Sequence, residues 1–289
     1  MFVRKKSVLL FLLPGLIGLM MFYVLPFIGG LYYSFTDGTY KNAFVGFDNY
    51  ISVLNNNIFQ TGLKNTFLLS LICMPLVWVL SFLIALSLTQ LKKGGEFFRN
   101  SVLLPYVMPS SAILLIWLLL FDYGGVINRL WVALFGFRVN FLEGSAMRFP
   151  VILMFVWTNI GFAVVIFLSA MQTVPPALYE YAVLEGASFW RIALSVTLPQ
   201  VLPTGFLVMI LEWVNAFKIF KEIYFIGGAY PGYEMYTLQN YMNNMYSNLN
   251  YQYVTTAAYI FAVMVFALFG VLFLVQMRTM KSLEGGAGA

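Results

Sequence analysis

Six long apolar runs dominate this chain, and each is long enough to cross a lipid bilayer as a helix. A helix needs about 20 predominantly apolar residues to span the hydrocarbon core. Inside a bilayer every backbone N–H and C=O group needs a partner within the protein, which restricts spanning segments to helices or closed barrels. We therefore expect an all-α, polytopic membrane protein that forms a single transmembrane domain over residues 1–289. The expected spanning helices cover residues 7–35, 65–91, 101–121, 150–171, 200–226 and 253–277.

The composition excludes a soluble fold and several kinds of chemistry. Hydrophobic residues make up 61% and charged residues 9% of the chain, with a mean hydropathy of +0.85, whereas soluble chains carry about 25% charged residues. The chain has no histidine and a single cysteine, Cys73, which excludes a disulfide framework, histidine-based catalysis and a His or Cys metal site. It also lacks the G-x-x-x-x-G-K-[ST] pattern that cradles the phosphates of ATP. We expect no enzyme activity and no cofactor in this chain.

The basic residues predict the orientation of the chain in the membrane. Six spans place both termini on one side. The side of the termini carries nine basic residues, namely Arg4, Lys5, Lys6, Lys92, Lys93, Arg99, Arg191, Arg278 and Lys281. The opposite side carries five, namely Lys41, Lys64, Arg129, Arg138 and Arg148. Because Lys and Arg accumulate in cytoplasmic loops, we expect a multi-pass cell-membrane protein with both termini in the cytoplasm. Topology thus explains the net charge of +5, and no nucleic-acid partner is expected.

The first apolar run could instead belong to a signal peptide. The apolar region of a signal peptide covers roughly 7–15 residues and is followed by small residues at a cleavage site. The run over residues 7–35 is longer and bulkier. We therefore expect a retained spanning helix, bent at Pro14 and Pro26.

The segment 174–199 lies between the fourth and fifth runs and is expected to form a cytoplasmic loop to which a partner protein binds. Pro175 and Pro176 can end one helix and open the next, because proline suits a first helical turn but not a helix interior. Good helix formers follow as far as Gly186. A glycine at this position marks either a helix end or a close approach of another backbone.

Six positions in this loop stand at fixed spacing, E-x-A-x3-G-x9-V-x-L-P, and they are Glu180, Ala182, Gly186, Val196, Leu198 and Pro199. This spacing resembles the EAA signature of permease subunits of bacterial ABC importers. Tyr181 and Glu185 stand where that family usually has alanine and aspartate. The resemblance implies that residues 174–199 form a coupling helix seated in a cleft of an ATPase subunit. The ATPase-coupling residues implied are Glu180, Tyr181, Ala182, Glu185, Gly186, Leu198 and Pro199.

Further segments resemble the carbohydrate-uptake branch of that family, in particular the first permease subunit of maltose-type and glycerophosphate-type importers. They are Val45–Tyr50, Phe98-Arg99, Leu104–Tyr106, Gly125–Asn128 and Gly227–Pro231. The resemblance implies a heterodimer with a second, related permease and two ATPase subunits that bind ATP and Mg²⁺. It also implies an extracytoplasmic binding protein that delivers a sugar or oligosaccharide.

The fifth run is interrupted by polar residues, and an ionisable residue in a membrane segment usually faces protein or water. Glu212, Asn215, Ile219 and Glu222 share one helical face, and Lys218 could pair with Glu222. This face could line a solute pathway. Alternatively, its charges could reach the membrane interface or pair between subunits. The fourth run adds one aromatic and one amide candidate, Trp157 and Asn159. The predicted pathway residues are therefore Trp157, Asn159, Glu212, Asn215, Lys218 and Glu222.

Other functions remain open at this point. Lys218 and Lys221 could attract a phosphorylated or acidic solute in place of a neutral sugar. An ion-coupled secondary transporter would need a buried coupling acid near the bilayer midplane, for which Glu212 is the candidate. An intramembrane enzyme is a third class, although the chain shows no paired carboxylates for it. The last seven residues, LEGGAGA, are expected to form a flexible tail.

Overall fold

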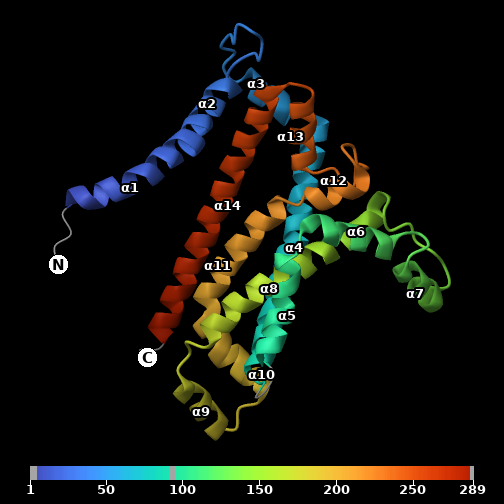
Figure 1. Cartoon of the computed structure of the whole chain (residues 1–289). Helices are drawn as coiled ribbons and strands as arrows, with labels where there is room; N and C mark the ends of the chain where they lie inside the picture. The colour runs from blue at the N-terminus through green and yellow to red at the C-terminus, as the bar shows by residue number, and fades with distance from the viewer. Residues whose placement is uncertain (1–4, 92–94, 287–289) are drawn as a thin grey trace. The chain divides into compact units, whose positions relative to one another are not determined.

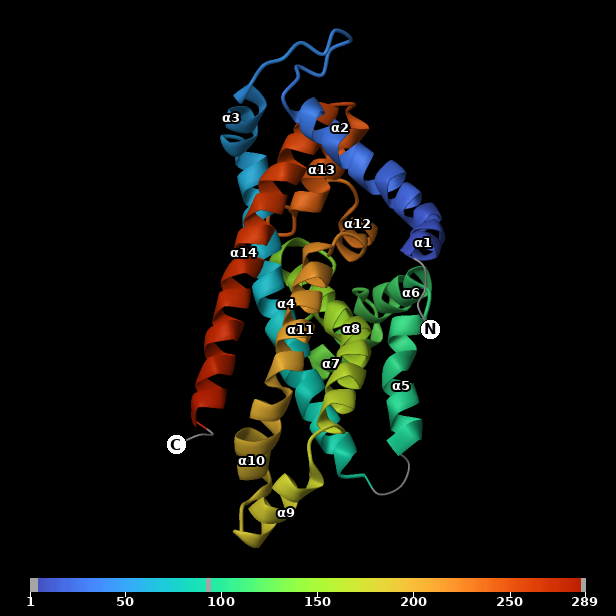
Figure 2. The same ribbon diagram turned by 90° about the vertical axis from the view of Figure 1, so that its left-hand side faces the viewer.

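The chain is all-helical in the computed structural model, which describes residues 5–91 and 95–286 (Figures 1 and 2). Within these ranges, β-structure is limited to one isolated bridge between Thr36 and Phe44. Arg4, Lys92 and Lys93, three of the basic residues used to predict the orientation, lie outside the described residues. Among the described residues, six segments are long and apolar enough to cross a membrane, as expected. Their bounds are Leu10–Ser34, Asn57–Thr89, Ser110–Phe135, Gly144–Met171, Phe189–Gly227 and Tyr251–Thr279.

The third apolar segment differs from the single helix expected over 101–121. The structure has helix α5, Gly95–Val107, and helix α6, Ser110–Phe121, with a break at Met108 and Pro109. Pro109 caps α6 with a ψ of 128°. Proline has no N–H to donate and disfavours a helical conformation of the residue before it, so one helix ends there and another begins. The other spans also differ from the predicted bounds, since the second begins at Asn57 and not at residue 65, and the fifth begins at Phe189 and not at residue 200.

Two prolines are accommodated by turns of π-helix. Helix α1, Lys5–Leu19, passes through the π-turn Met20–Val24 into helix α2, Leu25–Ser34, whose second residue is Pro26. The same order recurs where the π-turn Ala193–Thr197 precedes helix α11, Leu198–Phe217, whose second residue is Pro199. A proline ring collides with the carbonyl four residues earlier in an α-helix, and the wider π-turn relieves that collision. The expected interruption near Pro26 is therefore a π-turn, whereas Pro14 lies inside α1.

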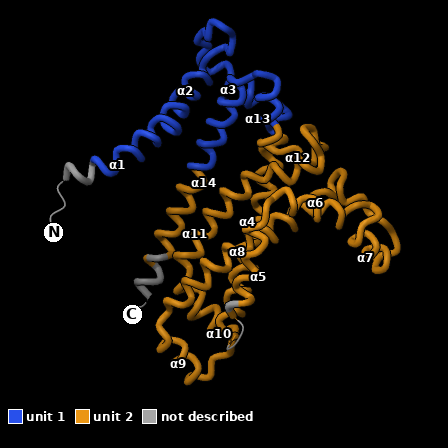
Figure 3. Tube along the Cα trace, in the orientation of Figure 1, with its two compact units in different colours: residues 1–60, 241–266 blue, residues 61–240, 267–289 orange. Residues whose placement is uncertain are grey.

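The chain divides into two compact units, residues 1–60 with 241–266 and residues 61–240 with 267–289 (Figure 3). In the first unit the end of α2 is fastened to helix α3, Asp48–Leu54. Asn49 is buried and its Nδ2 donates to the carbonyl oxygens of Ser34 (2.8 Å) and Thr36 (2.7 Å). The hydroxyl groups of Tyr50 and Ser34 lie 2.8 Å apart. The segment Val45–Tyr50 thus has a structural role, which is to close the loop after the first span.

An aspartate organises the same loop. The Asp37 carboxylate accepts from the backbone N–H of Thr39 (3.0 Å) and Ala43 (3.1 Å) and from the Thr39 hydroxyl. The hydrogen bonds from Thr39 lower the pKa of Asp37 below its usual value. Because the folded pKa is depressed, these contacts are present above the ordinary carboxyl pKa and are lost as the pH falls through the lowered value.

The second unit is built around helix α8, Arg148–Met171, which packs between α5 and α11 (Figure 1). Its buried residues form one core with α4, in which Val77, Val151 and Phe167 are fully buried. The Trp78 Nε1 of α4 donates to the carbonyl of Gly205 in α11 (2.8 Å). At Gly161 a Cβ atom would collide with the backbone of Val102, so glycine permits the close crossing of α5 and α8.

The first turns of α4 hold the chain that leads into helix α13, Leu238–Ser247. Asn65 Nδ2 donates to the carbonyls of Tyr233 (2.7 Å) and Tyr236 (2.9 Å), and Thr66 Oγ1 accepts from the N–H of Leu238 (2.9 Å). These hydrogen bonds from α4 therefore hold part of the Asn-rich segment that follows the fifth span.

Helices α7 and α12 complete the second unit. In α7, Val126–Phe135, the fully buried Asn128 exchanges two hydrogen bonds with the backbone of Val139, at 2.8 and 3.0 Å. Helix α12, Lys221–Gly227, ends at Gly228, whose φ is +70°. The last helix, α14, covers Tyr251–Gly286. The prediction of a flexible tail after residue 282 is therefore wrong for residues 283–286, which belong to α14. The remaining residues lie outside the described ranges.

We expect Asn49→Ala to destabilise the protein by about 1 to 3 kcal/mol, because two buried carbonyl groups lose their donor. The measurement is the thermal unfolding midpoint of the purified full chain. Asn55→Ala at the exposed end of α3 is the matched control and should have little effect. Equal shifts in the two variants would contradict this account of the loop.

Candidate functional site

The loop 174–199 contains a short helix, α9, Pro176–Leu184, between two membrane spans (Figure 2). Pro175 caps it and Pro176 begins it, as the sequence predicts. Helix α9 exposes apolar side chains to an unusual degree, since Tyr181 is 68%, Val183 63% and Leu184 82% exposed. Such an exposed apolar surface on a loop outside the bilayer marks an interaction site.

Gly186 ends α9 in a left-handed conformation, with a φ of +74°. The N–H of Gly186 donates to the carbonyl of Val183 (3.0 Å), and the N–H of Ala187 donates to that of Ala182 (2.9 Å). This pair of bonds is the Schellman arrangement, in which glycine occupies the left-handed position without strain. A Cβ atom at Gly186 would meet nothing within 4 Å in this chain. Of the two explanations left open by the sequence, the structure therefore shows the helix end.

A second short helix, α10, Phe189–Ile192, returns the chain to α11, with Ser188 accepting at its start from the N–H of Arg191 (3.4 Å). The buried Thr197 donates to the hydroxyl of Tyr179 at 3.4 Å. This contact joins α9 to the π-turn below α11. The sequence did not predict it, because Tyr179 and Thr197 share no periodic pattern and meet through the fold of the loop.

The predicted coupling residues fall into two groups. Glu180, Tyr181, Glu185 and Gly186 are exposed on α9 and at its end. Ala182, Leu198 and Pro199 are half-buried against the rest of the loop. The first group could therefore contact a partner, whereas the second supports the fold of the loop.

The structure brings together three of the predicted pathway residues. Asn215 of α11 donates from Nδ2 to Asn159 Oδ1 of α8 (3.4 Å), and Asn159 Nδ2 donates to the carbonyl of Phe155 (2.9 Å). Glu212 lies three residues before Asn215 on the same helix, α11. Glu212 is 1% exposed, and its Oε2 atom has no partner among the described residues. Asn159 and Asn215 are half-buried, so this polar group runs from the interior of the second unit to its surface.

The polar face expected to continue to Glu222 is broken. Helix α11 ends at Phe217, Lys218 is its exposed C-cap, and Glu222 belongs to α12. Ile219 and Glu222 therefore do not extend the face of Glu212 and Asn215, and Lys218 and Glu222 are not neighbours on one helix. The pattern of three- and four-residue spacings gave no signal of the turn at residues 218–220, because these residues include neither glycine nor proline.

The tryptophans near this polar group differ in their surroundings. Trp157 is 37% exposed and packs edge-on against Trp117 of α6, with ring centroids 5.7 Å apart. Trp213 is 4% exposed and packs against Phe217, so its faces are used within the chain. The sequence did not predict that Trp117 would meet Trp157. Among the described residues no group of His, Cys, Asp and Glu could hold a metal ion.

The fold and these sites define a polytopic helical membrane protein with an exposed loop helix and a polar group inside its helical core, which is the permease class. Residues 77–280 match the family model described as binding-protein-dependent transport system inner membrane component. The chain belongs to this family. It is therefore a permease subunit of a binding-protein-dependent ABC importer, a multi-pass inner-membrane protein whose ATP is handled by ATPase subunits.

Relatives and a solved structure agree with this family. A trehalose/maltose transport system permease of Thermococcus litoralis is 31% identical over 228 residues, which cover 77% of each chain. A multiple sugar-binding transport system permease of Streptococcus mutans is 28% identical over 284 residues, or 95% of each chain. The fold matches a chain of a bacterial ABC transporter that imports the acidic polysaccharide alginate, with a TM-score of 0.83, 23% identity and 96% of both chains covered. The resemblance in the sequence to carbohydrate-uptake permeases is confirmed.

The contact between Asn159 and Asn215 should be measurable as an interaction free energy. We expect a double-mutant cycle of Asn159→Ala and Asn215→Ala to give about 0.6 kcal/mol of coupling, the size found for side-chain hydrogen bonds between membrane helices. The measurement is the free energy of unfolding of the purified full chain in detergent. Strictly additive effects of the two substitutions would show that the amide groups do not interact.

Proposed function

We propose that this chain forms one half of the translocation pathway of an ATP-driven importer for a sugar or oligosaccharide, which an extracytoplasmic binding protein delivers. A second, homologous permease would form the other half, and two ATPase subunits would bind ATP and Mg²⁺ on the cytoplasmic side. The observation that carries this proposal is the exposed apolar helix α9 with its Schellman end at Gly186.

Helix α9 has the properties of a part that is covered in a larger assembly. Its exposed tyrosine, valine and leucine residues lie outside the membrane spans, where an exposed apolar surface costs free energy until a partner buries it. Glu180 and Glu185 add charge around this surface. A cleft in an ATPase subunit would bury the apolar residues, so closure of the ATPases would push α9.

The link from Tyr179 to Thr197 supports a route from α9 to the solute. Thr197 ends the π-turn that leads directly into α11, and α11 carries Asn215 at its other end. A displacement of α9 would thus be passed to the helix whose polar group faces the pathway. Rocking of two permeases would then expose the site alternately to either side of the membrane.

The solute we favour is a neutral sugar. Asn159 and Asn215 present amide groups, which suit sugar hydroxyls, and Trp157 presents a partly exposed ring on which a sugar can stack. The nearby Glu212 would repel an anion if it were ionised. Sugars are also named for the two relatives above. An acidic or phosphorylated solute remains the second candidate, because Lys218 and Lys221 are exposed at the turn after α11.

The orientation we propose places both termini and α9 in the cytoplasm of a bacterial cell. Among described residues, Arg99, Arg191, Arg278 and Lys281 lie on the side of α9 by topology. The positive-inside rule supports this orientation.

We expect Gly186→Trp to reduce solute uptake and ATPase stimulation by at least about fivefold, the lower range of measured allosteric coupling, while the complex still assembles in the membrane. Gly136→Trp is the matched control, because Gly136 also ends a helix with a left-handed φ, of +83°, and has nothing within 4 Å of a Cβ. Both changes carry the same backbone strain. Equal activity in the two variants would contradict a docking role for α9.

Purification of the full chain from membranes in mild detergent, followed by mass spectrometry, tests the assembly. We expect an ATPase subunit and a second six-span permease to copurify. A chain that purifies alone and still moves solute in liposomes without ATP would instead indicate an ion-coupled transporter. Glu212 would then be the first residue to substitute.

A further inference from the structure

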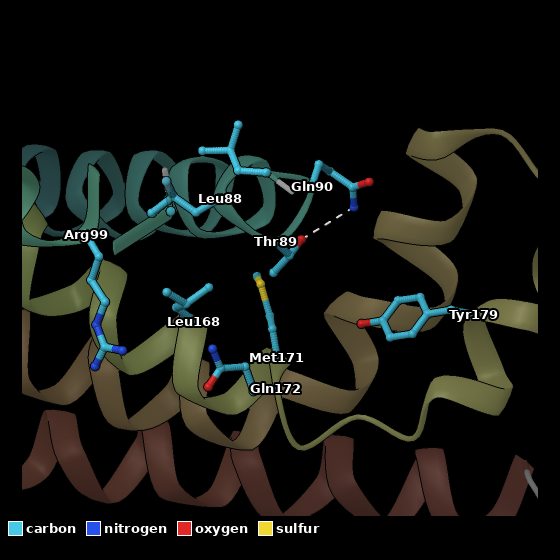
Figure 4. Close-up of a pocket in the computed structure, with 10 residues that line it drawn as sticks. Leu88, Thr89, Gln90, Arg99, Leu168, Met171, Gln172 and Tyr179 are labelled. Atoms are coloured by element: carbon cyan, nitrogen blue, oxygen red, sulfur yellow. Dashed lines mark hydrogen bonds between the residues drawn. The ribbon is translucent and has the colours of Figure 1, made fainter. Parts of the chain in front are cut away.

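A cavity of about 550 Å³ lies in the second unit beside the base of α9 (Figure 4). The end of α4, the beginning of α5, the end of α8 and helix α9 contribute its lining. In Figure 4, Arg99 and Tyr179 lie at opposite ends of the cavity, with Leu168, Met171 and Gln172 between them. The volume lies within the range of about 300–1,000 Å³ that is typical of small-molecule sites.

One part of the lining is polar and carries a positive charge. Arg99 is exposed on α5, and the described lining contains no carboxylate that could neutralise it. Gln172 after α8 and Gln90 after α4 add amide groups, and Gln90 Nε2 donates to Thr89 Oγ1 at 3.4 Å. A guanidinium group is suited to a phosphate, because it offers paired N–H groups in a planar fork.

The other part of the lining is apolar. Leu88 contributes from the end of α4, Leu91 from the chain just after it, and the buried Leu168 and Met171 from the end of α8. A free inorganic anion would leave this surface without a partner. A molecule with a phosphate and an adjoining apolar part would fill both parts of the cavity.

The position of the cavity also favours a lipid. The α4 span ends at Thr89 and the α8 span ends at Met171, so the lining lies where these helices leave the hydrocarbon core. Arg99 lies on the side of the termini, which is the cytoplasmic side in the orientation proposed above. Anionic phospholipids of the cytoplasmic leaflet are bound by basic pockets between membrane helices at this depth.

We propose that this cavity binds the headgroup of an anionic phospholipid of the inner leaflet, with Arg99 contacting the phosphate and the leucine residues contacting the start of the acyl chains. The assignment to the inner leaflet rests on the proposed orientation. Tyr179 belongs to α9 and lines the same cavity. A bound headgroup would therefore contact the helix to which we assign the coupling role, and lipid composition would affect how α9 is held.

Native mass spectrometry of the full chain, purified with its partners from nanodiscs of phosphatidylcholine with phosphatidylglycerol, tests this proposal. We expect retained phosphatidylglycerol in the wild type, and about fivefold less in Arg99→Gln, the effect of one basic residue at an anionic surface. Arg99→Lys should retain most of the lipid, because the charge is kept. Gln172→Trp should abolish retention by filling the cavity while leaving Arg99 in place.

Arg278→Gln is the matched control, because Arg278 is also exposed and lies on the same side by topology but does not line the cavity. An equal loss in Arg278→Gln would overturn the site, since it would indicate unspecific attraction to the membrane. Retention unaffected by Gln172→Trp would also overturn it. Displacement of the lipid by millimolar inorganic phosphate would show that the cavity takes a soluble anion instead. Lipid retention is measured separately from ATPase copurification, so either proposal can fail without the other.

Discussion

The structure depends on the requirement that backbone N–H and C=O groups inside a bilayer be satisfied within the protein. Helices meet this requirement until a proline removes a donor. Pro14, Pro75, Pro105 and Pro203 lie inside α-helices, whereas four prolines near helix starts are accommodated in three ways. Pro26 and Pro199 follow π-turns, Pro109 begins a new helix after a break, and Pro175 caps α9. The places where the helices change direction or end are therefore set by a few residues, and the loop 174–199 lies between two of them.

The regularity of apolar runs made the all-α class and six spans predictable, because length and hydropathy alone define a spanning helix. Pro175 predicted the start of α9, and Gly186 indicated its end as one of two alternatives, since each residue acts on the local backbone. The turn after Phe217 was not predictable, because Lys218 and Phe220 carry no local signal for it. Helix α11 nevertheless ends at Phe217, so the polar face predicted to continue to Glu222 is broken.

The candidate sites show the same distinction between local and long-range information. Glu180 and Gly186 were recognisable from fixed spacing along the chain. The contacts of Tyr179 with Thr197, of Asn159 with Asn215 and of Trp157 with Trp117 join residues from different segments. The spacing of residues within one helix does not predict these pairs, because they depend on how α6, α8, α9 and α11 pack.

The π-turn at Ala193–Thr197 sets the rotational phase of α11 relative to α10. A π-turn holds one residue more than an α-turn, and one residue corresponds to about 100° of rotation around a helix. The direction in which Asn215 faces therefore depends on a single additional residue some twenty positions earlier. A one-residue deletion in this turn would keep every polar side chain of α11 in the sequence and turn them toward different neighbours, so that the lining of a pathway can change without any substitution in it.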